Sequence, residues 1–152
     1  MGLSRSWAKI EFPVRMIDEE IRKHLEVEYG EEFDRVDTEN ENGIFSLEDG
    51  EAVCGEFEDL EALLIDKEIP FDRETAMDWQ QPPCLRIYRP AHETHGMALD
   101  FTIPLNENGE EMVTVSQIRE LLDNNEAPAS AIQAYLDESY TYPHLADFVK
   151  ED

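Results

Sequence analysis

Positive charge is scarce in this sequence: 12 of its 152 residues are Lys or Arg, whereas 37 are Asp or Glu. The net charge of −25 repels phosphate, so the sequence excludes direct binding to nucleic acid or to an anionic membrane through bulk charge. Long hydrophobic runs are also missing, because no stretch approaches the ~18 apolar residues of a membrane-spanning helix. The N-terminal segment lacks the apolar core of a secretory signal peptide.

Cysteine and glycine are equally sparse. Without a secretory signal, we expect Cys54 and Cys84 to be reduced thiols of a cytoplasmic protein, although their spacing leaves a disulfide open. The seven glycines stand singly, which excludes a glycine-rich phosphate loop. None of the six serines lies in a Gly-x-Ser-x-Gly motif. With no catalytic motif in view, we expect a protein that is not an enzyme and that has no cofactor.

Two segments resemble metal-binding patterns without completing them. His92 and His95 are three positions apart, whereas the zinc-protease motif needs His-Glu-x-x-His on a helix. They also lie between a proline and a glycine, so a solvated loop is favoured. Residues 38–49 approach the calcium-loop pattern, but Thr38 replaces the first acidic ligand and Asp49 replaces the final Glu. We expect no metal site.

Hydrophobic periodicity predicts a single α+β domain over residues 1–152, with a mostly antiparallel sheet, helices packed on one face and a C-terminal helical pair. The expected helices cover residues 17–29, 56–67, the region of 118–122, and a last helix that starts near Pro128. The expected strands and extended segments cover residues 7–15, 44–47, 51–54, 69–74, 84–89, 97–103 and 112–115. Residues 31–42 are expected to form a loop or a short acidic strand.

Three further expectations concern single positions. Pro13 places the first strand at a sheet edge or ends it, because proline cannot donate to a ladder. The pair Asp49-Gly50 is typical of a hairpin turn. The aromatic and apolar residues of the C-terminal tail indicate that it docks onto the domain.

The acidic excess is concentrated in two segments. Residues 26–61 contain 15 acidic residues and a single basic residue, Arg35. Residues 93–152 contain 13 acidic residues and two basic ones, whereas the rest of the chain is nearly neutral. A compact domain of this length is roughly 38 Å across. If most carboxylates face one way, the linear charge density approaches that of duplex DNA, with one charge per ~1.7 Å.

Such an excess can serve solubility, adaptation to high salt, or recognition of a basic partner. We rate salt adaptation lower, because Glu exceeds Asp by 24 to 13 and bulky apolar residues are retained. In size and composition the chain resembles the DNA-mimic inhibitors of phages and mobile genetic elements, which block restriction or CRISPR effectors. The resemblance implies a competitive inhibitor that occupies the nucleic-acid-binding groove of a basic protein.

The sequence therefore predicts a non-enzymatic acidic domain that binds a basic, nucleic-acid-binding protein. Within the first acidic segment, the residues expected to contact this partner are Glu26, Glu28, Glu31, Glu32, Asp34, Asp37, Glu39, Glu41, Glu48, Asp49, Glu51, Glu56, Glu58, Asp59 and Glu61. One alternative is an interaction domain that uses an exposed apolar patch around Trp79 and Tyr88. A small enzyme or metal-binding protein is the least supported alternative.

Overall fold

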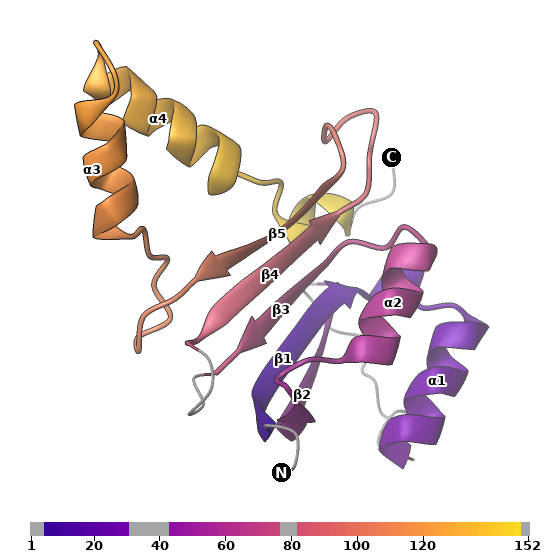
Figure 1. Ribbon diagram of the computed structural model, residues 1–152. Helices are drawn as coiled ribbons and strands as arrows, with labels where there is room; N and C mark the ends of the chain where they lie inside the picture. Colours follow the sequence, from indigo (N-terminus) through magenta and orange to yellow (C-terminus); the bar gives the residue numbers. More distant parts are fainter. Residues whose placement is uncertain (1–4, 31–42, 77–81, 150–152) are drawn as a thin grey trace.

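The computed structural model describes residues 5–30, 43–76 and 82–149 (Figure 1). One antiparallel sheet has the strand order β2-β1-β3-β4-β5, where the strands are β1 (Arg5–Pro13), β2 (Ile44–Val53), β3 (Phe71–Thr75), β4 (Cys84–Arg89) and β5 (Leu99–Pro104). The described helices are α1 (Glu19–Tyr29), α2 (Glu58–Asp66), α3 (Val115–Asp123) and α4 (Pro128–Ser139), together with the short 3-10 helices η1 (Val14–Met16) and η3 (Leu145–Phe148). The fold is α+β, as the sequence predicts.

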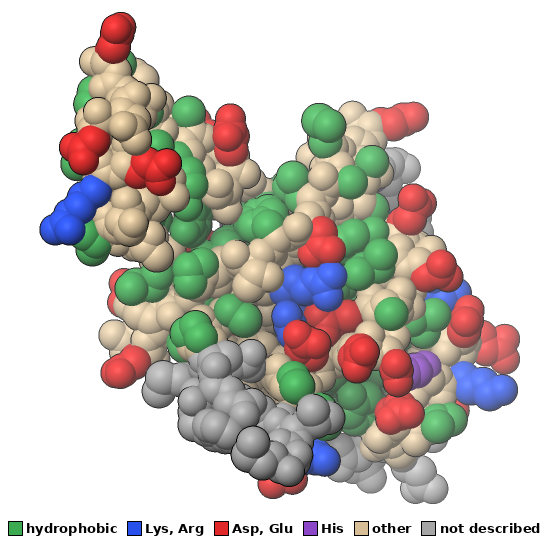
Figure 2. All heavy atoms as spheres, in the orientation of Figure 1, with side chains coloured by type: hydrophobic (Ala, Val, Ile, Leu, Met, Phe, Trp, Pro, Cys, Tyr) green, Lys and Arg blue, Asp and Glu red, His purple; other side chains and the backbone are tan. Residues whose placement is uncertain are grey.

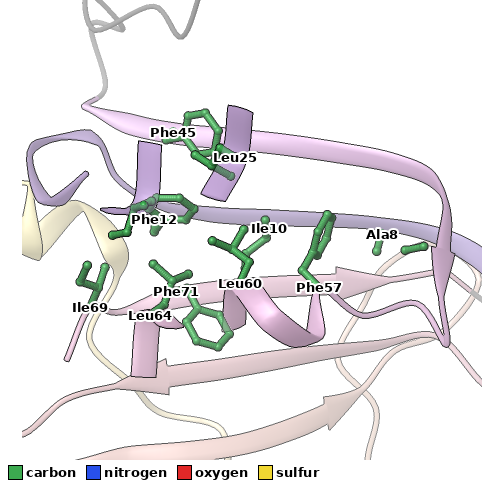
Figure 3. Packing of buried hydrophobic residues seen from close by; sticks show 12 residues of the cluster. Ala8, Ile10, Phe12, Leu25, Phe45, Phe57, Leu60, Leu64, Ile69 and Phe71 are labelled. Atoms are coloured by element: carbon green, nitrogen blue, oxygen red, sulfur yellow. The ribbon is translucent and has the colours of Figure 1, made fainter. Parts of the chain in front are cut away.

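The main core lies between one face of the sheet and the helices α1 and α2 (Figures 1 and 3). Alternate residues of β1 supply its centre, because Ala8, Ile10 and Phe12 all point to the same face and are completely buried. Helix α2 places Leu60 and Leu64 against them, at the four-residue spacing of one helix face. Burial of this apolar surface is the main stabilising contribution to the fold.

A smaller cluster covers the opposite face of the sheet at β4 and β5. Ile87, Ile103 and Leu105 are buried there, and Tyr140 and Tyr142 pack against them from the C-terminal part of the chain. Arg89, 1% exposed, fixes this segment: its Nε donates to the carbonyl of Pro143 at 2.7 Å. The C-terminal tail therefore docks on the sheet, as the sequence predicts.

The C-terminal 3-10 helix η3 also packs against the end of β1. Nε of Arg15, just after β1, donates to the carbonyl of Phe148 in η3 at 2.8 Å. Next to this bond, Gly43 has a φ of +68°, and a Cβ on it would collide with the side chain of Val149. Position 43 therefore requires glycine for its backbone conformation and for the close approach of the C-terminal segment.

Helices α3 and α4 form an arm, residues 115–139, that stands apart from the sheet beyond β5 in Figure 1. Neither helix contains a buried residue, and the two helices pack mainly against each other. The hydroxyl of Tyr140 ties the base of the arm together by donating to the carbonyl of Met112 at 2.6 Å. Within the described residues, no helix combines the length and apolarity that a membrane span requires.

Two of the sequence-based expectations about strands are wrong. Asp49-Gly50 is not a hairpin turn: β2 runs unbroken through it and pairs with β1 on both sides. The register shifts there, so that Gly50 and Glu51 face a single residue, Trp7, and the glycine marks a β-bulge. Residues 112–115 form no strand, because α3 already begins at Val115.

Pro13 ends β1, which lies inside the sheet between β2 and β3, so the strand-end expectation is confirmed and the edge expectation is wrong. The expected loop or strand at residues 31–42 and the loop that carries Trp79 lie outside the described residues. Cys54 and Cys84 are not joined by a disulfide, and both are half-buried.

Candidate functional site

An acidic groove of about 360 Å³ lies where α1, β2 and the start of α2 meet. Its walls include Tyr29 and Phe57, whose ring centroids are 6.3 Å apart. One Arg and one His, Arg5 and His24, also line it. The carboxylates of the groove come from three separate elements: Glu28, Asp49, Glu51, Glu56, Glu58 and Asp59. All six belong to the residues that the sequence predicts for partner binding.

Local structure explains how these side chains converge. Glu28 lies in the last turn of α1, and Glu58 and Asp59 lie in the first turn of α2, where the helix dipole favours anions. The β-bulge in β2 separates Asp49 from the residues that follow it, and Oδ1 of Asp49 accepts a hydrogen bond from the backbone N–H of Glu51 at 2.9 Å. The bulge and two helix ends thus bring distant parts of the chain to one concave surface.

Tyr29 reports the electrostatic character of the groove. Its side chain is half-buried, and this burial, followed by the negative charges of Asp49, Glu28 and Asp59, raises the pKa of Tyr29 to about 12. Ionisation of the phenol would add another anion to this surface, so the carboxylates oppose it. The groove therefore combines the partly exposed ring of Tyr29 with a negative potential, whereas Phe57 is buried behind it.

Most ion pairs of the described basic residues lie outside the groove. Lys67 lies 2.7 Å from both Asp18 and Glu20, at the other end of α1. Lys9 and Arg89 pair with acidic residues on the sheet. Within the described residues, Glu56 is the one carboxylate of the groove in an ion pair, with Arg73 Nη1 at 3.6 Å. Figure 2 shows the resulting surplus of acidic side chains over α1 and α2.

Glu61 does not contribute to this surface, which corrects the sequence-based expectation that it contacts a partner. It is 2% exposed, and its Oε2 accepts a hydrogen bond from the backbone N–H of Phe57 at 2.7 Å. Its Oε1 lies 3.3 Å from Nε of Arg73 and 3.2 Å from Nη1 of Arg86. Two arginines from neighbouring strands therefore hold the carboxylate inside the fold.

The remaining predicted contact residues lie outside the groove. Glu26 is exposed on α1, and Glu48 is exposed on β2, where it faces Lys9 across the strand pair. Six residues of the predicted set lie outside the described part of the chain: Glu31, Glu32, Asp34, Asp37, Glu39 and Glu41. The second acidic segment lies mainly on β5, the arm and the loops beside them, so it does not extend the groove.

The histidine pair that resembled a metal motif has a different local role. The rings of His92 and His95 stack with centroids 4.5 Å apart, and both contact the ring of Phe148. Nδ1 of His92 accepts the backbone N–H of Thr94 at 3.0 Å, which turns the loop. Across residues 5–30, 43–76 and 82–149, no three His, Cys, Asp or Glu side chains gather in a way that could hold a metal ion.

Comparison with known proteins yields no match, whether against protein-family models, curated sequences or solved structures. The chemistry of the groove is therefore the available guide to function. Carboxylates bind guanidinium and ammonium groups through charge-assisted hydrogen bonds, and an aromatic wall adds a favourable surface for a cation. The geometry suits a Lys or Arg side chain presented by another molecule.

Proposed function

We propose that this protein binds a basic surface of another protein through the acidic groove. Five of its six carboxylates have no Lys or Arg ion-pair partner among the described residues, and this observation carries the proposal. The partner fits best as a nucleic-acid-binding protein, because such proteins present clustered Lys and Arg that normally face phosphate. The protein then acts as an inhibitor of the DNA-mimic kind, which competes for that surface without chemistry of its own.

The placement of Glu28 supports a role beyond stability. A carboxylate in the last turn of a helix opposes the helix dipole, and Glu28 also shares the groove with the like-charged Asp49. Neither the dipole of α1 nor Asp49 stabilises the ionised Glu28 in the isolated protein. A cation supplied by a partner reverses both effects, so the groove gains more from binding than scattered surface carboxylates do.

Charge reversal tests the proposal. We expect the triple variant Glu28→Lys, Glu51→Lys, Asp59→Lys to bind a decaarginine peptide at least tenfold more weakly than the unmodified protein, because the groove loses its negative charge. The control is Glu120→Lys, Asp123→Lys, Glu126→Lys, which changes the net charge equally but on the arm. Its affinity should fall less than threefold.

The salt dependence of binding provides a second measurement. Affinity for decaarginine should fall steeply as the salt concentration rises from 0.05 to 0.2 M, because exposed charges are screened beyond ~8 Å at physiological ionic strength. Partners captured from a bacterial lysate at low and high salt should show the same dependence. Equal losses for the groove and arm variants would show that net charge alone acts, and the groove would no longer be the site.

The alternative interaction surface around Trp79 and Tyr88 has less support. The ring of Tyr88 packs against Phe71 with centroids 5.4 Å apart, and its side chain is half-buried. An apolar patch would therefore depend on Trp79, which lies outside the described residues. Substitution of Trp79 by Ala, compared with the groove triple variant, distinguishes the two surfaces: the acidic-groove proposal expects little effect of Trp79→Ala.

A further inference from the structure

The strand β5 forms an open edge of the sheet. It pairs with β4 over six consecutive residue pairs without a register shift, and the strand order ends at β5 within the described residues. Proteins usually protect such an edge with a bulge, a lysine or a covering element. β5 has a proline, Pro104, at its last position and one charged residue, Asp100, whose carboxylate is held by Arg86 at 2.8 Å. The middle of the strand, Asp100–Thr102, contains no bulge, lysine or proline.

The direction of the free backbone groups follows from two hydrogen bonds at the end of β5. The N–H of Leu105 donates to the carbonyl of Pro83 at 3.0 Å, on the side of β4. The carbonyl of Pro104 accepts from the N–H of Met112 at 2.8 Å, on the outer side. Because successive residues direct their N–H and C=O groups to opposite sides, Thr102 and Asp100 direct theirs outward.

A cavity of about 510 Å³ lies directly against this edge. Phe101 and Thr102 both line it, although successive side chains of a strand point to opposite faces, so the cavity reaches the edge itself. Its other wall is the arm, which contributes Gln117 from α3 and Tyr135 and Glu138 from α4. Figure 2 shows the surface hollowed between the arm and the body of the protein.

We infer that this cavity binds an extended, basic segment of a partner protein, which adds to the sheet as a strand beside β5. Outward N–H and C=O groups provide the main-chain hydrogen bonds of strand addition, and the neighbouring cavity accommodates its side chains. The charge selects a basic segment, because Glu138 lines the cavity and none of the described Lys or Arg residues does. A second copy of this chain, with its net charge of −25, would be repelled.

This site is separate from the acidic groove, and the inference does not depend on the function proposed for the groove. The groove is built on α1, β2 and α2, whereas β5 is the opposite edge strand of the sheet. The two surfaces can therefore be tested independently on the same protein. A segment that is basic and apolar in alternation presents one set of side chains to the cavity and the other to solvent.

The test uses a hexapeptide of alternating Lys and Val, acetylated and amidated at its ends, and the same peptide N-methylated at every residue. We expect nuclear magnetic resonance to show slower hydrogen exchange, by at least fivefold, at the amides of Asp100 and Thr102 when the first peptide binds. The N-methylated peptide has the same charge but no backbone donors, so its affinity should be at least tenfold lower.

Two variants of Thr102 test whether the outward backbone N–H of β5 is needed for binding. Thr102→Pro removes the outward N–H without removing a hydrogen bond to β4, and it should abolish the protection, whereas Thr102→Val keeps the N–H and should preserve binding. The triple groove variant Glu28→Lys, Glu51→Lys, Asp59→Lys should bind the hexapeptide through the edge as the unmodified protein does. If Thr102→Pro does not fold, the comparison of the two peptides on the unmodified protein decides.

Three results would overturn the inference. Equal affinity for both peptides would show that charge alone attracts them. Absence of protection at Asp100 and Thr102 up to millimolar peptide would show that the edge does not accept a strand. Protection that rises with protein concentration in the absence of peptide would assign the edge to a second copy of the chain.

Discussion

Oε1 of Glu61, on α2, lies 3.3 Å from Nε of Arg73, on β3, and the two side chains are only 3% and 6% exposed. Arg86 on β4 contacts the same oxygen at 3.2 Å and joins the pair to Asp100 on β5 at 2.8 Å. A chain of alternating charges thus crosses from the helix layer to the edge of the sheet. Because Glu61 and Arg73 are buried, each depends on its charged neighbours.

We predict that Glu61→Gln lowers the free energy of unfolding by about 3 kcal/mol, because it leaves two arginines facing each other without the shared carboxylate. Denaturant unfolding followed by circular dichroism measures the change. Glu120→Gln, at an exposed position on α3, is the control and should change the free energy of unfolding by about 0.5 kcal/mol or less. A loss below 1 kcal/mol for Glu61→Gln would mean that this carboxylate is not needed to balance the arginines.

The titration of Tyr29 should report the charge of the groove. We predict that the triple variant Glu28→Gln, Asp49→Asn, Asp59→Asn lowers the pKa of Tyr29 from about 12, yet leaves it above 10 because burial is the largest cause of the shift. Ring-labelled tyrosine followed by nuclear magnetic resonance measures the pKa, and Tyr29→Phe assigns the signal. An unchanged pKa would show that these carboxylates do not act on the phenol.

The raised pKa of Tyr29 makes the stability of the fold depend on pH. An unfolded tyrosine ionises near pH 10, whereas Tyr29 in the folded protein keeps its proton to about pH 12. The folded state therefore holds more protons in this interval, and the contribution of Tyr29 to stability falls as the pH rises from 10 to 12. Below pH 10 both states are protonated and the contribution is constant.

Removing one carboxylate of the groove should stabilise the isolated protein. We predict that Glu28→Gln raises the free energy of unfolding by about 0.5 kcal/mol at low salt, because the charge no longer opposes the dipole of α1. Glu19→Gln, in the first turn of the same helix, should have the opposite sign. Both effects should shrink in 1 M salt. Destabilisation by Glu28→Gln would contradict the view that this carboxylate is placed for binding.

Arg89 should not tolerate lysine. Its Nη1 donates to the carbonyls of Phe71 and Tyr88 at 3.1 and 2.9 Å, in addition to the bond from Nε to Pro143. A lysine lacks this fork of donors, so we predict that Arg89→Lys lowers the free energy of unfolding by about 2–3 kcal/mol. Thermal and denaturant unfolding measure the loss. Arg22→Lys, exposed on α1, should change it by about 0.5 kcal/mol or less.

Many of the strands and helices could be predicted because each has a local hydrophobic periodicity. The alternation at Ala8, Ile10 and Phe12 and the four-residue spacing at Ile21 and Leu25 each matched a real element. The order of the strands could not be predicted in the same way, because the pairing of β1 with β3 joins segments about sixty residues apart. Local turn chemistry was misleading at Gly50, where pairing with β1 on both sides keeps the strand unbroken.

The candidate site could be predicted only in part, because the sequence shows where acidic residues are concentrated but not which of them converge. The charge count identified the acidic segment, but the convergence of Glu28, Asp49 and Asp59 depends on tertiary packing that composition does not encode. Glu61 was assigned wrongly because its partners, Arg73 and Arg86, lie 12 and 25 positions away and only the sheet brings them together. The cavity beside β5 had no signal in the sequence, since it depends on where the arm stands.

The hydrogen bond from Arg15 to Phe148 affects how this chain folds during translation. β1 is synthesised well before the segment that closes against its end, because Arg15 and Phe148 are 133 positions apart. Until Leu145–Phe148 has been synthesised, the contact between Arg15 in η1 and Phe148 cannot form. Closure at the end of β1 therefore requires residues 145–148, and chains that stop before residue 145 should be cleaved more readily by proteases near Arg15.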